Sequence, residues 1–340
     1  MTAGRYVLPA LLAAALACGC NPFSSSTSSE MSAEDAAAFE AAREKQLQIE
    51  REQAKHASYA EIKVIRPGAK TPFKNLSALG LTKDGNLLAC DAGTSTIHVL
   101  NQDGESVAKW KLSFAPQALA IAPDGTIFVA GPKVLAKLDA EGKVTKQTKL
   151  SGKSVAAATA SDKDIFVSIP AGTGFTVTRF SHELEEPKSI VSGLRGCCGI
   201  LDICWHDGKL YAAENGRFRV VSYDRDGKQL GKWGEGDRED VAKFAGCCNP
   251  KNLCLSSDGR IYVAESSPDR IKRYSADGKY EELIGWFTGR EGCWGVDLVS
   301  SADGKRLYYA DSTANFVRVL EPKPAAEHAS QSTAAAEVKP

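Results

Sequence analysis

The feature that most constrains the fold is a unit that recurs along the chain at intervals of roughly 40 residues. Each unit places an apolar stretch before a tight turn and a run rich in Ile, Tyr, Phe and Val after it. Asp-Gly favours such turns because glycine tolerates positive φ, so each unit predicts a β-hairpin. The six turns lie at Asp84-Gly85, Asp124-Gly125, Asp162-Lys163, Asp207-Gly208, Asp258-Gly259 and Asp303-Gly304.

Several units continue with a polar loop, a third strand, a second turn and a fourth strand. The second turns lie at Asp103-Gly104, Glu141-Gly142, Asp226-Gly227 and Asp277-Gly278. A single sheet of this size cannot bury both of its faces, whereas six such sheets packed around an axis can. We therefore predict an all-β fold, a six-bladed β-propeller with four-stranded antiparallel blades.

The sixth unit stops after its third strand, residues 315–320, where a Pro-rich segment begins. Residues 60–65, just before the first unit, have the composition of a strand but belong to no unit. We predict that this N-terminal strand completes the sixth blade, which closes the ring and removes an exposed sheet edge.

The first 20 residues are typical of a secretory signal peptide. Arg5 supplies the positive charge, residues 7–17 are apolar, and small residues precede a cysteine. The segment is too short to be a permanent membrane span. Its end resembles a bacterial lipobox, which predicts lipid attachment at Cys20, with Cys18 as the alternative. An ordinary cleaved signal with incidental cysteines is the other interpretation. We expect an exported, membrane-anchored lipoprotein that faces the periplasm or the cell exterior.

The next segment, residues 21–58, begins as a Ser-rich tether. Ser32 then has the character of a helix N-cap before an Ala/Glu/Lys/Gln-rich run. The apolar face of this run is thin, so we expect a solvated helical spacer, or alternatively a helix that docks on the domain or on a partner. The propeller is expected to cover residues 59–321, and residues 322–340 are expected to be disordered because they lack an apolar pattern.

Cysteine is the residue whose pattern stands out. Two stretches share the pattern Cys-Cys-x5-Cys, and a weaker echo follows; their cysteines are Cys197, Cys198 and Cys204, then Cys247, Cys248 and Cys254, then Cys293. Alignment of the units places Cys204 and Cys254 inside first strands, where we expect small buried hydrophobic residues, as at Cys90. The five remaining cysteines precede first strands and should ring one mouth of the propeller, the cysteine-bearing mouth.

Three interpretations of this mouth remain open: structural disulfides between blades or within a doublet, a metal or iron–sulfur site, and redox or nucleophilic thiols. If the alternation of side chains along a strand persists into the loops, it disfavours a Cys198–Cys248 pair and favours Cys198 facing Cys247. The chain lacks the Cys-x-x-Cys spacing typical of zinc sites, and it lacks the Cys-x-x-Cys-His of c-type haem attachment.

Acidic residues end four of the second strands and should lie at the same mouth; they are Asp91, Glu214, Glu265 and Asp311. We expect them to accept loop N–H groups or to pair with an arginine such as Arg270 or Arg318, and a site for calcium or another hard cation is the alternative. Residues 234–246, the longest connection between blades, are expected to lean over this mouth.

Other classes of function find no support in the chain. The 42 basic and 42 acidic residues balance, and basic residues do not cluster, so no nucleic-acid partner is expected. No phosphate-binding loop, dinucleotide fingerprint or Ser/His/Asp arrangement is present. His206 follows Cys204 closely but lies beside a hairpin turn, where a solvated side chain is expected.

The units resemble the NHL repeats of six-bladed β-propellers. Residues 261–278 place a strand, an acid, Arg270-Ile271 and an Asp-Gly turn in the order of that family, and residues 307–318 follow the same pattern. Unit two departs from it, with Gly131 in place of the acid. The resemblance implies the fold, whereas members of the family include interaction scaffolds, extracellular sensors and a few enzymes.

We therefore expect a non-enzymatic binding or scaffold protein of the exported bacterial lipoprotein type. It would bind a protein or a small molecule at the cysteine-bearing mouth and the membrane through its lipid, with no cofactor. One alternative is a redox protein that uses a metal ion or an iron–sulfur cluster held by the Cys-Cys loops. The second alternative is a lactonase-type metal-dependent hydrolase, although the acids and Asn of gluconolactonase-type propellers do not map onto this chain residue by residue.

Overall fold

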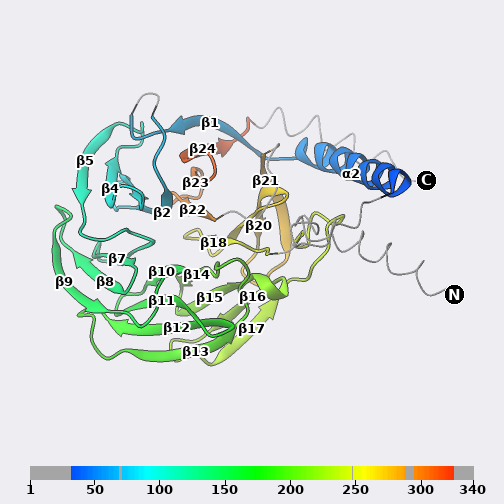
Figure 1. The fold of residues 1–340 in the computed structure, drawn as a ribbon. Coiled ribbons are helices and arrows are strands. Elements are labelled where there is room, and N and C mark those ends of the chain that lie inside the picture. Colours follow the sequence, from blue (N-terminus) through cyan, green and yellow to red (C-terminus); the bar gives the residue numbers. More distant parts are fainter. Residues whose placement is uncertain (1–31, 69–70, 247, 288–294, 325–340) are drawn as a thin grey trace.

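A computed structural model of the chain describes residues 32–68, 71–246, 248–287 and 295–324. Six four-stranded antiparallel sheets form a ring, and the helix α2 (Ala33–Ala54) lies beside it (Figure 1). The prediction of a six-bladed β-propeller with an N-terminal helix is confirmed. The predicted signal peptide with Cys18 and Cys20, most of the Ser-rich tether, Cys247, Cys293 and the tail beyond residue 324 lie outside the described residues.

The blades follow one another in chain order, and each begins with its innermost strand. Blade 1 comprises β2 (Leu76–Leu81), β3 (Leu87–Asp91), β4 (Thr96–Leu100) and β5 (Ser106–Lys111). Blade 2 comprises β6 (Ala118–Ile121), β7 (Ile127–Gly131), β8 (Val134–Leu138) and β9 (Val144–Lys149). Blade 3 comprises β10 (Ala157–Ala160), β11 (Asp164–Ala171), β12 (Gly174–Ser181) and β13 (Lys188–Leu194). Blade 4 comprises β14 (Ile203–His206), β15 (Lys209–Glu214), β16 (Arg219–Tyr223) and β17 (Gln229–Trp233). Blade 5 comprises β18 (Asn252–Leu255), β19 (Ile261–Glu265), β20 (Asp269–Tyr274) and β21 (Tyr280–Phe287). Blade 6 comprises β22 (Val296–Ser300), β23 (Leu307–Asp311), β24 (Phe316–Pro322) and β1 (Tyr59–Ile65).

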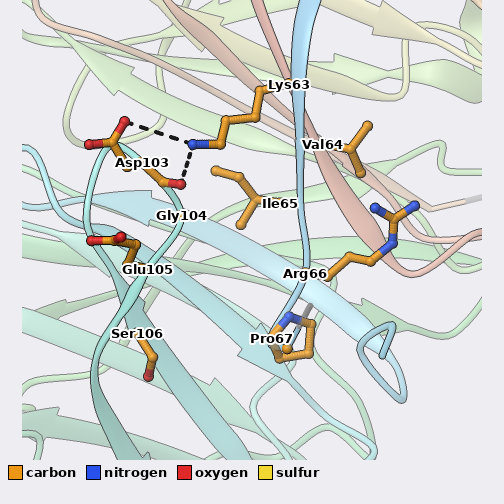
Figure 2. A pocket seen from close by; sticks show the side chains of 10 residues that line it. Lys63, Val64, Ile65, Arg66, Pro67, Asp103, Gly104, Glu105 and Ser106 are labelled. Atoms are coloured by element: carbon orange, nitrogen blue, oxygen red, sulfur yellow. Dashed lines mark hydrogen bonds and ion pairs between the residues drawn. The ribbon is translucent and has the colours of Figure 1, made fainter. Parts of the chain in front are cut away.

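The ring closes as predicted from the sequence. Strand β1 pairs antiparallel with β24, from Tyr59 opposite Pro322 to Ile65 opposite Val317, so the first strand of the chain completes the last blade. The closing strand also contacts blade 1. Lys63 donates a hydrogen bond to the carbonyl of Asp103, and its Nζ lies 3.8 Å from the Asp103 carboxylate (Figure 2). These contacts fasten the two ends of the propeller to each other.

The second strand of each blade lies between two neighbouring blades and is apolar on both faces. Every residue of β3, β7, β19 and β23 is buried, as is β15 after its first residue. The outermost strands are different: β9 alternates half-buried and exposed residues, because only one face packs against the protein. Each large apolar side chain buried between blades stabilises the fold by about 1.5–3 kcal/mol.

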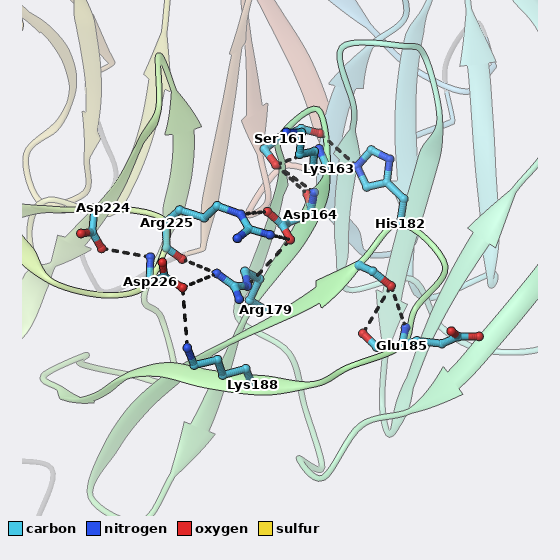
Figure 3. Close-up of polar contacts among 11 residues, drawn as sticks. Ser161, Lys163, Asp164, Arg179, His182, Glu185, Lys188, Asp224, Arg225 and Asp226 are labelled. Carbon is cyan, nitrogen blue, oxygen red and sulfur yellow. Dashed lines mark hydrogen bonds and ion pairs between the residues drawn. The ribbon is translucent and has the colours of Figure 1, made fainter.

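Aromatic and charged residues join blades 3 and 4. Phe166 of blade 3 stacks on Trp205 of blade 4, with ring centroids 4.9 Å apart. On the face that carries the Asp-Gly turns, Arg225 of blade 4 donates two hydrogen bonds, of 2.5 and 2.8 Å, to the buried carboxylate of Asp164 in blade 3 (Figure 3). Arg179 pairs with Asp226 beside them. Arg179, Arg225, Asp164 and Asp226 therefore form a charge network between the two blades.

Candidate functional site

The structure brings together three of the cysteines predicted at the cysteine-bearing mouth. The sulfur atoms of Cys197 and Cys198 lie 3.6 Å apart, and those of Cys198 and Cys248 lie 3.7 Å apart. All three sulfur atoms lie within 4.8 Å of one another. Cys197 and Cys198 come directly before blade 4 and Cys248 before blade 5, so the cluster bridges two blades. We call these three residues the thiol triad.

The strand alternation on which the prediction against a Cys198–Cys248 pair depends does not extend to these residues, because the backbone at both is left-handed. Their φ angles are 55° and 72°, which ends the alternation of side chains that holds in an extended strand. Gly199 follows with a φ of 75°, and the N–H of Ile200 donates a 3.0 Å bond to the carbonyl of Cys197. This tight turn presents Cys198 toward the neighbouring blade.

Two buried asparagines hold the loops of the triad in place. Asn215, in the 3-10 helix η1 (Asn215–Arg217), accepts a 2.7 Å hydrogen bond from the N–H of Cys197 and donates one of 3.0 Å to the carbonyl of Ile200. In blade 5, Asn249 exchanges two 2.9 Å hydrogen bonds with the backbone of Ser266. The loops that carry the thiols are therefore tied to the ends of second strands and are pre-ordered.

The triad runs from the interior to the surface. Cys248 is 1% exposed, Cys197 is half-buried, and Cys198 is exposed. Burial raises the pKa of the Cys197 thiol, and a hydrogen bond with Cys248 and the positive charge of Lys251 act in the opposite direction. A ligand from solvent can thus reach the triad on the side of Cys198.

Lys251, three residues after Cys248, is an unusual residue. Its side chain is fully buried, and its ammonium nitrogen has no hydrogen-bond partner among the described residues. A buried ammonium without a partner is costly, because it loses its hydration without a compensating contact. Its charge nevertheless acts on Cys197 in the next blade. Sequence reasoning missed this residue, although Lys251 lies inside the second Cys-Cys-x5-Cys stretch, because nothing in that pattern signals a buried ammonium.

The cysteines inside strands lie elsewhere in the fold and differ in chemistry. Cys90 and Cys254 are buried, and Cys204 is half-buried in β14. Burial raises the pKa of the Cys204 thiol to about 12, and it raises those of Cys90 and Cys254 as well. These thiols stay neutral at ordinary pH and serve as small apolar side chains.

The four acids predicted at the mouth are buried, and each binds groups of its own blade. Asp91 accepts hydrogen bonds from the N–H groups of Lys74, Asn75 and Gly93 at 2.9–3.1 Å. Burial raises the pKa of Asp91, but these backbone donors outweigh it and hold that pKa below its ordinary value. Asp311 accepts from the N–H of Ala314 and pairs with Arg318 at 2.9 Å. Asp91 thus binds the segment before β2 and the loop after β3, and Asp311 binds the loop after β23 and Arg318 of β24.

Glu214 and Glu265 pair with two cations each. Glu214 lies 2.7 Å from Arg217 and 2.5 Å from Arg219. Glu265 lies 2.6 Å from both Arg270 and Lys272. Across the described part of the chain, the thiol triad is the one group of three or more His, Cys, Asp or Glu side chains placed to share a metal ion. The acids therefore do not converge on a hard-cation site in these residues.

Three polar residues near the propeller axis were missed by sequence reasoning. Asp202, Asn252 and Asp297 stand four residues after Cys198, Cys248 and Cys293, so they are equivalent positions in blades 4, 5 and 6. The alignment that located the cysteines would have located these residues as well. They connect blades to one another across the innermost strands.

Each of these side chains binds the next blade. Asp202 accepts from the N–H of Leu253 at 2.7 Å, and Asp297 accepts from the side chain of Asn252 at 2.9 Å and from the N–H of Leu79 at 2.6 Å. Desolvation, followed by the charge of Asp297, raises the pKa of Asp202 well above its ordinary value. Desolvation raises the pKa of Asp297 to about 6, although its hydrogen bonds oppose the shift.

Residues 234–246 contact β20, the third strand of blade 5. The carbonyl of Lys243 accepts hydrogen bonds from Arg270 at 3.1 Å and from Lys272 at 2.5 Å. Helix α2 contacts the same segment, since the amide of Gln53 donates a 3.0 Å bond to the carbonyl of Glu239. Thus α2 docks on the propeller, which was the alternative to a purely solvated spacer. This helix is not long and apolar enough to cross a membrane.

Comparison with known proteins identifies the fold. No family model matches the chain, and no curated protein matches it. Similar solved structures include virginiamycin B lyase from Staphylococcus aureus (TM-score 0.52, 14% identity, 75% of this chain and 83% of that one) and a gluconolactonase from Xanthomonas campestris (0.54, 12%, 78% and 99%). Another is the β-propeller domain of Swd1 from Myceliophteria thermophila (0.53, 11%, 78% and 100%).

The chain is a six-bladed β-propeller. At these levels of identity the similarity shows the fold alone, and the similar structures include both a lyase and a gluconolactonase. The fold therefore does not select between catalysis and binding, and the function has to be argued from the site.

Proposed function

We propose that this protein is an exported, lipid-anchored propeller. It binds a thiophilic ligand, one that bonds to thiol sulfur, through the thiol triad at its cysteine-bearing mouth. The observation that carries the proposal is the meeting of three sulfur atoms from two blades, within 4.8 Å of one another, with the buried Lys251 three residues after Cys248. The NHL-type repeat pattern supports a binding role, because propellers of this kind present one face to a ligand.

The distribution of charge favours binding over hydrolysis. A lactonase-type site needs carboxylates directed at a metal ion or at a substrate. Asp91 and Asp311 instead bind their own loops, while Glu214 and Glu265 bind cations of their own blades. The cleft lined by residues 63–68 and 103–106 lies beside the Asp103-Gly104 turn and includes no residue of the triad (Figure 2). The triad is therefore the better-supported site.

The N-terminal sequence supports export and anchoring. Residues 1–20 are typical of a lipoprotein signal, and the helix that follows the tether rests on blade 5. Expression of the full chain in a bacterium followed by cell fractionation tests this part. We expect the wild-type protein in the membrane fraction and Cys20→Ser in the soluble exported fraction, with Cys18→Ser unchanged. Wild-type protein in the cytosol would refute it.

Phenylarsine oxide tests the triad, because its arsenic atom bonds to two neighbouring thiols and releases its oxygen as water. Intact-mass measurement of the reduced full chain should show one adduct, which Cys198→Ala abolishes. Cys254→Ala is the matched control, since Cys254 belongs to the same Cys-Cys-x5-Cys pattern but is buried inside β18. An adduct that survives Cys198→Ala, or no adduct on fully reduced protein, would contradict the proposal.

A further inference from the structure

We propose that the thiol triad binds a single Zn²⁺ ion, with Lys251 balancing the charge of the complex; this rests on the proposed function of the same three residues. Cys197, Cys198 and Cys248 would supply three thiolates. The described residues place no fourth His, Cys, Asp or Glu side chain with them, so a ligand from solvent would take the fourth position of the ion. The ion would join blades 4 and 5.

The spacing of the sulfur atoms fits one tetrahedral ion. With Zn–S bonds of 2.3 Å, neighbouring thiolates stand about 3.8 Å apart. The Cys197–Cys198 and Cys198–Cys248 distances are 3.6 and 3.7 Å. A disulfide would require a separation of about 2.05 Å and would use two of the three sulfur atoms, which leaves the third unexplained. The thiolates of a four-iron cluster bind different irons, so three sulfur atoms this close suit one ion better.

The charges of the three thiolates, the ion and Lys251 sum to zero when the ion is Zn²⁺. Three thiolates and a divalent ion carry a net charge of −1, which the ammonium of Lys251 neutralises. This accounts for a lysine that is fully buried, lacks a hydrogen-bond partner among the described residues and acts electrostatically on Cys197. A monovalent ion such as Cu⁺ would leave a net charge of −1 even after this lysine is counted. Thiolate ligands suit both metals, so the charge balance is what favours Zn²⁺.

The supporting residues hold the ligands at fixed positions. Asn215 binds the N–H of Cys197, and Asn249 binds the backbone of Ser266 directly after β19. Three protein ligands with one open position are the arrangement of reactive rather than closed structural zinc sites. Because Cys198 is exposed, that open position can meet a ligand that approaches from solvent. The ion would thus give the mouth its affinity for anionic or sulfur-containing ligands.

The test uses the full chain, extracted from membranes with detergent and purified under reducing conditions without a chelator. Metal analysis should find one zinc per chain. Titration of the stripped protein with Zn²⁺ against a chromogenic chelator gives the affinity. Cys198→Ala and Cys248→Ala should weaken binding by more than the roughly 10- to 100-fold typical of losing an outer-shell partner, and Lys251→Met should fall within that range. Cys254→Ala is the control and should bind as wild type does.

Co²⁺ serves as an optical probe, because it absorbs strongly in the visible region when thiolates surround it tetrahedrally. The wild type and Cys254→Ala should show this absorption, and Cys248→Ala should lose it while keeping the circular dichroism spectrum of a folded propeller. A phenylarsine oxide adduct without zinc binding would overturn the zinc inference and leave the proposed function standing. Failure of both would overturn both. Retention of Cu⁺ in place of zinc, or equal loss of zinc in Cys254→Ala, would also refute the inference.

Discussion

Blades 4 and 5 carry the same Cys-Cys-x5-Cys pattern and the same acid at the end of the second strand, yet they differ in what lies over that acid. In blade 4, the side chains of Arg217 and Arg219 that pair with Glu214 are 43% and 23% exposed. In blade 5, Glu265 and its two partner cations are fully buried. The repeat thus determines which residues pair, and a segment outside the repeat determines whether water reaches the pair.

That segment is residues 234–246, with α2 resting on it. The carbonyl of Lys243 replaces water as the acceptor for Arg270 and Lys272, and the hydroxyl of Tyr274 donates a 2.9 Å bond to the carbonyl of Ala242. Burial also lowers the pKa of Lys272 to about 7, although the charge of Glu265 opposes this shift. The same acid therefore has a larger structural role in blade 5 than in blade 4.

The largest expected effect comes from removing the charge of the two acids in turn. Glu265→Gln leaves the buried Arg270 without its counter-ion and should cost roughly 3–5 kcal/mol of unfolding free energy. Glu214→Gln should cost no more than about 2 kcal/mol, since its arginines can turn toward water. Urea unfolding followed by circular dichroism at pH 7 measures both values. Equal losses would show that the covering segment does not isolate blade 5 from solvent.

An intermediate effect concerns the axial position at which blade 4 has Asp202 and blade 5 has Asn252. Asp202→Asn makes the two blades alike. The folded-state pKa of Asp202 is raised well above its ordinary value of about 3.9, so the folded protein binds the proton more tightly than the unfolded chain does. The stability that this proton contributes is present below pH of about 4 and is lost as pH rises toward the folded pKa.

Relative to wild type, Asp202→Asn should therefore gain stability between pH 4 and 7. The neighbouring Asp297, with a pKa of about 6, changes stability by about 3 kcal/mol over this range in both proteins, so the difference between them reports Asp202. Cys204 and Cys254 adjoin these acids but do not titrate there, because burial raises the pKa of both thiols. Urea midpoints of both proteins at several pH values measure the difference. If the difference in urea midpoint between Asp202→Asn and wild type did not change with pH, the raised pKa of Asp202 in the folded protein would be refuted.

The fold was predictable because its signals are local and repeated. Six hairpins with Asp-Gly-type turns, and a spare strand at residues 60–65, define the number of blades and the closure of the ring. The contact between Cys198 and Cys248 was not predictable, because a left-handed backbone at both residues overrides the strand alternation. The burial of Lys251 was not predictable either, because it arises from the tertiary fold and no neighbouring residue in the sequence indicates it.

The smallest expected effect tests whether α2 contributes to the difference between the two blades. Gln53 donates to the carbonyl of Glu239 and accepts a 3.5 Å contact from Arg270, and Glu50 pairs with Arg238 at 3.3 Å. Such surface contacts contribute about 1 kcal/mol or less each, so Gln53→Ala should barely change the global unfolding free energy. It should instead raise the rate of amide exchange in residues 234–246, measured by hydrogen–deuterium exchange mass spectrometry.

Gln48→Ala provides the control, because Gln48 is exposed on the same helix. If α2 holds the segment against blade 5, only Gln53→Ala speeds exchange, and blade 4 is unaffected in both variants. If the two variants exchange equally, the hydrogen bonds between the backbone of Phe244 and the residues Glu235 and Asp237 order the segment by themselves. The burial of Glu265 would then follow from the length of this connection alone, and α2 would serve only as a spacer.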